Sequence, residues 1–350
     1  MSEENENLRD NDSKCAAEDK EGTRTDVNAA GVSAIENADR LHIYRRSVLW
    51  IALIAVAVRL TAFFTAFDTD IGYFNRNNIF PVTSDALLAI AALWTITAAF
   101  VFRKRDGMIR SPEFSGGAVY FAGLYAGFIF IADAVYKAYT FADSYRSGKL
   151  DSILERFKNP KYYQTQADKI ARILAVIAVL GFISSVLASV YFLRGSDGKK
   201  KNGQTWLGFF VIIRCLCGIA RIYFDMNVPM NNPCKLLCEI SLMSVMLYFL
   251  TEERFIIGEE KARPHLFIAS GLAAFLFSTV AGVTSVVGFF TGVAPYAEYC
   301  AEGIVMLTCA LYIFTRLFVY EKITRAPVVL PIADASDTET SDVETDAESK

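Results

Sequence analysis

The sequence predicts an all-α, polytopic integral membrane protein with about eight transmembrane helices in two four-helix halves. Three observations lead to this fold class. The 350-residue chain is 53% hydrophobic with a mean hydropathy of +0.30, its apolar residues gather in long runs, and two loops between these runs share a short motif. This composition excludes a coiled coil, a collagen-like chain, a small disulfide scaffold and a single soluble domain.

Each span is expected from an apolar run of about 18 residues or more, which is long enough to cross a hydrocarbon core about 30 Å thick. Because lipid offers the backbone no hydrogen-bond partner, each run should form a helix. The fifth and sixth runs are the weakest, since both contain charged residues. The expected spans lie at 47–67, 83–102, 115–141, 170–193, 205–224, 233–250, 265–290 and 297–320.

The charges divide the chain into an apolar, basic middle and two acidic tails. Residues 1–40 carry a net charge of −6 and residues 321–350 a net charge of −5, so residues 41–320 carry +8. The segments 1–40 and 333–350 are acidic and polar, which predicts disorder. They either solubilise the protein or offer sites for a basic protein partner or for phosphorylation. Residues 1–40 contain no apolar core of a cleavable signal, so the first span should act as its own signal.

Loop charges predict that both termini are cytoplasmic. With this orientation 16 Lys and Arg residues flank the spans on the inner side and 7 lie in the outer loops, which follows the positive-inside rule. The outer loop 142–169 is the exception, with six of the seven, and within it residues 150–158 predict a short amphipathic helix on the membrane surface. The short loops weakly favour a bacterial plasma membrane.

An internal repeat is expected, with halves at 47–193 and 205–320 joined by the basic linker 194–204. Two loops carry Phe-Asp-x-[Asp/Asn], then Asn-Asn, then Pro. Four spans per half make an even number, so the two halves would be parallel repeats. Alternatively, the motifs recur by chance because these residues favour turns and first helical turns. The motif residues are Phe67, Asp68, Asp70, Asn77, Asn78 and Pro81, and Phe224, Asp225, Asn227, Asn231, Asn232 and Pro233.

Charged residues inside the expected spans are the most informative feature. All lie in the outer half of the membrane, apart from Arg316, which is expected to reach the cytoplasmic surface with its long side chain. A lipid-facing charge at mid-membrane costs about 2.5–3.5 kcal/mol, so these groups should face each other or water. They are Arg59, Asp133, Lys137, Arg172, Arg214, Arg221, Glu239 and Glu302.

The spacing of these charges predicts several partners. Asp133 with Lys137, and Arg221 with Asp225, are four residues apart and share a helix face. Arg214 and Arg221 are seven apart and also share a face. Glu239 and Glu302 are expected to pair with Arg214 or Arg59.

With five cations and three carboxylates, an outward-facing cavity would suit a small anion or a lipid head group. The alternative is a closed salt-bridge network that fixes helix packing. The candidate ligand-binding residues are Arg59, Asp133, Lys137, Arg214, Arg221, Glu239 and Glu302.

No sequence motif indicates a catalytic, metal or cofactor site. There is no phosphate-binding loop, no HExxH, no GxSxG, and no His/Cys cluster with metal-ligand spacing. Cys234 and Cys238 are four apart, but with no histidine nearby they are interpreted as small apolar helix residues. A nucleic-acid partner is not expected.

The sequence thus favours a protein that binds or transports a small anionic solute or lipid head group. The alternative is a non-catalytic structural or interaction subunit of a membrane complex. An intramembrane enzyme acting on lipid, with Asp133 or Glu239 as acid or base, ranks last.

Overall fold

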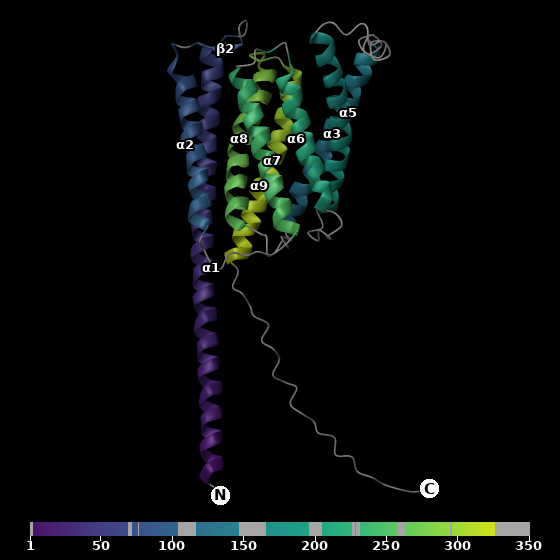
Figure 1. Ribbon diagram of the computed structural model, residues 1–350. Coiled ribbons are helices and arrows are strands. Elements are labelled where there is room, and N and C mark those ends of the chain that lie inside the picture. The colour runs from purple at the N-terminus through teal and green to yellow at the C-terminus, as the bar shows by residue number, and fades with distance from the viewer. Residues whose placement is uncertain are drawn as a thin grey trace, which may run out of the picture. The chain divides into compact units, whose positions relative to one another are not determined.

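The computed structural model describes residues 3–68, 72–75, 77–103, 117–146, 166–195, 205–225, 228, 232–257, 263–294 and 296–325, and no side chain before Val32. By its contacts the chain divides into Ser33–Arg325 and a second unit made of the terminal segments. Of the second unit, the structure describes the helical backbone from Glu3 onward. Ser33–Arg325 is a bundle of long helices that lie side by side (Figure 1). The expected disorder at 333–350 and the expected helix at 150–158 lie outside the described residues.

The described elements alternate between long helices and short turns. They are α1 (Glu3–Ala66), β1 (Phe67–Asp68), β2 (Tyr73–Phe74), α2 (Ile79–Phe102), α3 (Gly117–Arg146), α5 (Gln166–Gly195), η2 (Thr205–Leu207), α6 (Gly208–Tyr223), α7 (Pro233–Ile257), α8 (Pro264–Phe290) and α9 (Ala297–Arg325).

Seven of these helices are long and apolar enough to cross a membrane: α1 over Val32–Ala66, α2, α3, α5, α7, α8 and α9. The chain is therefore an all-α, multi-pass membrane protein, as the apolar runs predict. Large apolar side chains that the bundle leaves exposed, such as Ile90, Leu93 and Phe100 on α2, face the bilayer. The seven helices match seven of the eight expected spans, with ends that differ by a few residues except in α1.

The remaining expected span, 205–224, is the fifth in chain order and corresponds to α6. This helix has 16 residues, so it is about 24 Å long at 1.5 Å per residue, shorter than a hydrocarbon core of about 30 Å. The single 3-10 turn η2 precedes it directly. The basic residues Arg214 and Arg221 both belong to α6.

The helix α1 begins much earlier than the expected span at 47–67. Ala34, Ala38 and Leu41 are buried in the bundle at helical spacing, and the side chains of Arg45 and His42 both contact Glu321 of α9. Residues 33–40 therefore belong to the folded bundle, which corrects the expected disordered tail over 1–40. The physical reason is the row of small apolar residues that continues one helix face toward the N-terminus.

A short β-hairpin joins α1 to α2, a feature the sequence analysis does not predict. Phe67 pairs with Phe74 and Asp68 with Tyr73. Gly72 makes the turn with φ of 71°, a conformation that glycine adopts at little cost. We call the end of the bundle that carries this turn the hairpin end.

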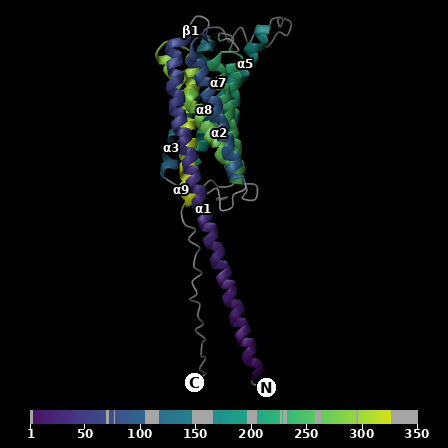
Figure 2. The ribbon, with the colours of Figure 1, turned by 90° about the vertical axis from the view of Figure 1, so that its left-hand side faces the viewer.

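Six helices close into a ring in which each packs on the next, in the order α3, α5, α6, α7, α8, α9 and back to α3. On one flank of the ring, α2 packs on α8. Helix α1 lies beside α2 (Figure 1, Figure 2). Trp94 of α2 donates a 2.9 Å hydrogen bond to Ser47 of α1. Helices of the two expected halves are thus interleaved, because α2 packs on α8 and α3 on α9.

Glycines allow the closest helix approaches. A Cβ on Gly127 of α3 would lie 2.6 Å from Leu193 of α5, and one on Gly282 of α8 would lie 2.8 Å from the carbonyl oxygen of Gly303 in α9. Such small residues let backbones approach in a membrane, where packing rather than water exclusion holds helices together.

Candidate functional site

A buried ion-pair cluster lies inside the six-helix ring. Arg214 of α6 donates from Nε to Oδ2 of Asp133 in α3 at 2.7 Å, and from Nη2 to Oδ1 at 2.9 Å. The same Nη2 lies 2.9 Å from both carboxylate oxygens of Glu302 in α9. All three side chains are buried, and that of Arg214 is 0% exposed. One guanidinium therefore ties together three helices that are far apart in the sequence.

Two further side chains complete this cluster. Lys137 donates from Nζ to Oδ2 of Asp133 at 2.6 Å, one helical turn along α3. Ser185 of α5 donates to the same oxygen at 2.6 Å. We call Asp133, Lys137, Ser185, Arg214 and Glu302 the central cluster. Its two cations balance its two carboxylates, so the surplus of positive charge expected from the sequence is not present among its described residues.

A second Arg–Glu pair lies nearer the hairpin end on the same two helices. Arg221, seven residues after Arg214 on α6, donates from Nη2 to Oε1 of Glu298, four residues before Glu302 on α9. The side chains of Arg221 and Glu298 are 19% and 47% exposed, respectively. The two pairs form successive rungs between α6 and α9, one at the helix ends and one about 6–10 Å farther in. The sequence analysis pairs Arg221 with Asp225, whereas the structure pairs it with Glu298.

Gly218 separates these two rungs. A Cβ at this position would lie 3.0 Å from Nη1 of Arg214, 3.0 Å from Oε2 of Glu302 and 3.1 Å from Leu242. Nη1 of Arg214 is buried and has no hydrogen-bond partner among the residues that the structure describes. A buried donor without a partner is costly. The central cluster therefore holds one guanidinium nitrogen that an added acceptor would satisfy.

Arg59 belongs to a separate site at the hairpin end. It donates from Nη1 to Oδ1 of Asp85 at 2.7 Å, lies over the ring of Phe74 at 4.8 Å, and reaches the carbonyl oxygen of Pro233 at 3.4 Å. Its side chain is 1% exposed, while that of Asp85 is 64% exposed. Arg59 thus joins α1, α2 and the start of α7 and does not enter the central cluster.

Glu239 does not take the role that its position in the sequence predicts. It was expected to pair with Arg214 or Arg59, but these pair with other carboxylates. Glu239 is half-buried on α7, and its Oε1 has no hydrogen-bond partner among the described residues. Of the seven candidate ligand-binding residues, four therefore meet in the central cluster: Asp133, Lys137, Arg214 and Glu302.

The two motif loops touch at the hairpin end. Asn78 caps α2 by accepting from the Phe80 N–H at 3.0 Å, and Asn232 caps α7 by accepting from the Cys234 N–H at 2.8 Å. Asn232 also donates to the carbonyl oxygen of Gly72 at 2.6 Å.

The other motif residues occupy comparable places in the two loops. Phe67 and Phe224 each directly follow the helix that ends there, and Pro81 and Pro233 lie in the first turns of α2 and α7. Asp68 lies in β1 and Asp225 just beyond α6. Asp70 and Asn227 lie outside the described residues.

A second buried cluster, toward the opposite end, is absent from the sequence analysis. Arg316 of α9 donates from Nε to Oε1 of Glu252 in α7 at 2.8 Å, and Tyr312 and Tyr191 donate to Glu252 at 3.3 and 3.5 Å. We call these four residues the tyrosine cluster. The expectation that Arg316 reaches the membrane surface is wrong, since it is buried. The reason is that α7 continues to Ile257, beyond the expected end at 250, and so carries Glu252 opposite Arg316.

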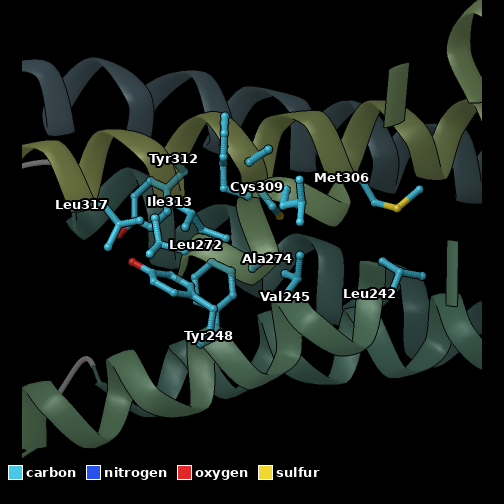
Figure 3. Close-up of a cluster of buried hydrophobic side chains, with 14 of the residues drawn as sticks. Leu242, Val245, Tyr248, Leu272, Ala274, Met306, Cys309, Tyr312, Ile313 and Leu317 are labelled. Atoms are coloured by element: carbon cyan, nitrogen blue, oxygen red, sulfur yellow. The ribbon is translucent and has the colours of Figure 1, made fainter. Parts of the chain in front are cut away.

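An apolar layer separates the two clusters. On α9, Glu302 and Arg316 are 14 residues apart, about 21 Å, and Met306, Cys309 and Ile313 lie between them. Figure 3 shows these side chains packed against Leu242, Val245, Leu272 and Ala274 from α7 and α8. These seven side chains are all buried, so apolar packing fills much of the bundle interior between the two clusters.

The chain matches no protein-family model, no curated protein and no solved structure in the three comparisons made. Within the described residues no group of His, Cys, Asp and Glu could hold a metal ion. What the site can do chemically therefore follows from its own side chains. Buried guanidinium and ammonium groups bind anions, and buried carboxylates bind protons or cations.

Proposed function

We propose that the protein binds, and carries across the membrane, a small anionic solute or the anionic head group of a lipid. The binding groups are Arg214 and Lys137 of the central cluster, which are balanced in the resting protein by Asp133 and Glu302. Binding exchanges a protein carboxylate for the ligand. The single observation that carries the proposal is the buried Nη1 of Arg214, a donor without a described partner inside a charged cluster.

Two further observations support a carrier that opens at the hairpin end. The Arg221–Glu298 pair lies between the central cluster and that end and is partly exposed, so polar groups continue from the surface to the cluster. On the other side, the apolar layer of Figure 3 separates the cluster from the opposite end. Alternating access requires a binding site that is reached from one side of the membrane at a time.

The finer membrane topology is part of this proposal. With η2 and α6 as an eighth span, every described helix crosses the membrane, and the hairpin end faces outward. Both termini are then cytoplasmic, as the excess of Lys and Arg near the other ends predicts, in the plasma membrane of a bacterium. A reporter that is active only in the cytoplasm, fused after Lys350, tests this topology, and an inactive fusion in a stable protein contradicts it.

The parallel repeat of two four-helix halves is also proposed, on the likeness of the two motif loops. Both loops begin at a Phe after a helix end, use an Asn to cap the next helix, and lie at the same end of the bundle. Helices α2 and α3 of the first half pack on α8 and α9 of the second half. In this arrangement the central cluster takes residues from both halves, as a shared ligand site does.

Thermal stability of the purified protein tests ligand binding. Nitrate, acetate, phosphate and the short-chain lipid dihexanoylphosphatidylglycerol are screened in detergent, and a ligand at 100 times its dissociation constant adds about 2.7 kcal/mol to the folded state. Arg214→Lys keeps the charge but removes the bidentate geometry, so it should lose this stabilisation. Arg59→Lys, at the separate hairpin-end site, is the matched control and should keep it. The absence of any stabilisation by all four compounds overturns the proposal.

A second candidate function is that of a non-catalytic structural or interaction subunit. The observation that favours it is the charge balance of the central cluster, whose two carboxylates are already paired. In that case the cluster only fixes helix register, and a protein partner binds the acidic terminal segments. Co-purification of a stoichiometric protein, lost when residues 333–350 are deleted, together with no ligand-linked stabilisation, supports this alternative.

A further inference from the structure

The charge balance of the central cluster limits what an anion can do there. The cluster holds two cations, Arg214 and Lys137, and two carboxylates, Asp133 and Glu302, all buried. If a singly charged anion entered alone, the buried cluster would carry a net charge of −1. A buried uncompensated charge is strongly unfavourable. An anion that enters together with one proton leaves the cluster neutral.

The two carboxylates differ in how firmly they are held as anions. Asp133 accepts hydrogen bonds from Arg214 Nε, Arg214 Nη2, Lys137 Nζ and Ser185 Oγ. Glu302 accepts only from Nη2 of Arg214 among the residues that the structure describes. Hydrogen bonds to the ionised form favour that form. Glu302 is therefore the carboxylate that an entering anion displaces more readily from its donor.

The surroundings of Glu302 agree with this assignment. The titratable groups near Glu302 come from four helices. They are Lys137, Asp133 and the phenol of Tyr136 on α3, Arg214, Cys215 and Cys217 on α6, Cys238 on α7, and Glu298 one turn earlier on α9. The α8 side offers hydroxyl groups such as Ser285. Arg214 is the cation in direct contact with Glu302. An anion that accepts from Nη1 and Nη2 of Arg214 together takes over this contact from Glu302.

We infer that the central cluster takes up one proton with each singly charged anion, and that Glu302 is the proton acceptor. The anion A⁻ replaces Glu302 on Arg214, and H⁺ from the solvent at the hairpin end neutralises the released carboxylate. Before binding the cluster holds Arg214⁺, Lys137⁺, Asp133⁻ and Glu302⁻. Afterwards it holds Arg214⁺, Lys137⁺, Asp133⁻, A⁻ and protonated Glu302, so charge is balanced on both sides. The ligand class is thus a monovalent anion, free or as a phosphodiester head group. This inference rests on the proposed function.

Proton uptake on binding tests the inference directly. Nitrate and dihexanoylphosphatidylglycerol are titrated into the detergent-solubilised protein by calorimetry in two buffers of different ionisation enthalpy. We expect about one proton taken up per anion bound, and an apparent dissociation constant that rises about tenfold per pH unit between pH 7 and pH 9. Nitrate separates a free solute from a head group, since a lipid site responds only to the second probe.

Glu302→Gln sharpens the test because glutamine resembles the protonated carboxylic acid. This variant should bind the anion without proton uptake, with an affinity that no longer depends on pH and that exceeds the affinity of the native protein at pH 8 by about tenfold or more. Glu298→Gln, on the next turn of the same helix, is the control and should keep the uptake of one proton.

The outcomes separate this inference from the proposed function. If none of the four screened compounds binds, the anion-binding function fails and the inference fails with it. If a probe binds without proton uptake and without pH dependence, the function stands and the inference is wrong. If Glu302→Gln does not fold, the proton stoichiometry of the native protein alone decides.

Discussion

The two buried clusters stabilise charge inside the apolar bundle with different sets of side chains. The central cluster joins two cations and two carboxylates from α3, α6 and α9, with a hydroxyl from α5. The tyrosine cluster pairs Arg316 with Glu252 and surrounds the carboxylate with the hydroxyls of Tyr191 and Tyr312. In both, charge inside an apolar bundle is stabilised by direct contact, since isolated charges in a membrane are costly.

The comparison indicates which cluster can exchange partners. In the central cluster Asp133 contacts both cations, so it remains paired with Lys137 when Arg214 turns to another acceptor. In the tyrosine cluster Arg316 contacts Glu252 at 2.7–2.8 Å, and the hydroxyls of Tyr312 and Tyr191 donate to the same carboxylate. Separation of this pair would break the contact between two buried, oppositely charged groups, which is strongly unfavourable. Under the proposed function, ligand exchange therefore belongs to the central cluster and helix anchoring to the tyrosine cluster.

The largest effect is expected from Arg316→Leu. Loss of the guanidinium leaves Glu252 buried without this cation and should lower the free energy of unfolding by about 3–5 kcal/mol. Glu252→Gln added to Arg316→Leu should recover most of this loss, because no charge then remains at the pair. Thermal unfolding in detergent measures both. Anion-linked stabilisation should persist in the double variant, and its disappearance there would place the tyrosine cluster in the binding site.

An intermediate effect is expected from Gly218→Ala. The added methyl group would lie 3.0 Å from both Arg214 Nη1 and Glu302 Oε2, so it should push the inner rung apart at a cost of about 1–3 kcal/mol. It should also weaken anion binding, since it fills the space beside Nη1. Gly117→Ala, where a Cβ meets nothing within 4 Å, is the matched control. Equal melting temperatures for the two variants would contradict the close packing between the rungs.

The smallest effect is expected at the helix caps of the two motif loops. Asn78→Ala and Asn232→Ala each remove a capping hydrogen bond, which is worth about 0.5–2 kcal/mol. Asn232→Ala should cost more, because Asn232 also donates to the Gly72 carbonyl oxygen and joins the two loops. Urea unfolding in mild detergent measures the difference. A larger loss for Asn78→Ala would show that the loops do not support each other.

Some features of the fold follow from local sequence properties. Seven spans could be predicted because an apolar run of about 20 residues has one low-energy structure in lipid, the helix, whatever its neighbours are. The predicted starts of two spans, at 233 and 297, also coincide with the first residues of α7, Pro233, and of α9, Ala297. The contact of Lys137 with Asp133 follows from a spacing of four on one helix.

Other features depend on residues that lie far apart in the sequence. Arg214 could be predicted to face inward, but its choice of Asp133 and Glu302 over Glu239 depends on how α3, α6 and α9 rotate against each other. The tyrosine cluster was missed because the apolar run ends at 250 while the helix continues to Ile257. Burial of Glu252 beyond that run requires Arg316 on another helix.

The sequence by itself thus determined the all-α membrane fold and the presence of charged residues inside the helix bundle, because hydropathy and charge are properties of single residues and short runs. Only the tertiary structure decided which charges meet. It showed a central cluster with two cations and two carboxylates where the sequence predicts a positive surplus. The reason is that net charge within a site is set by which helices pack together, and packing in a membrane depends on the fit of side chains between helices.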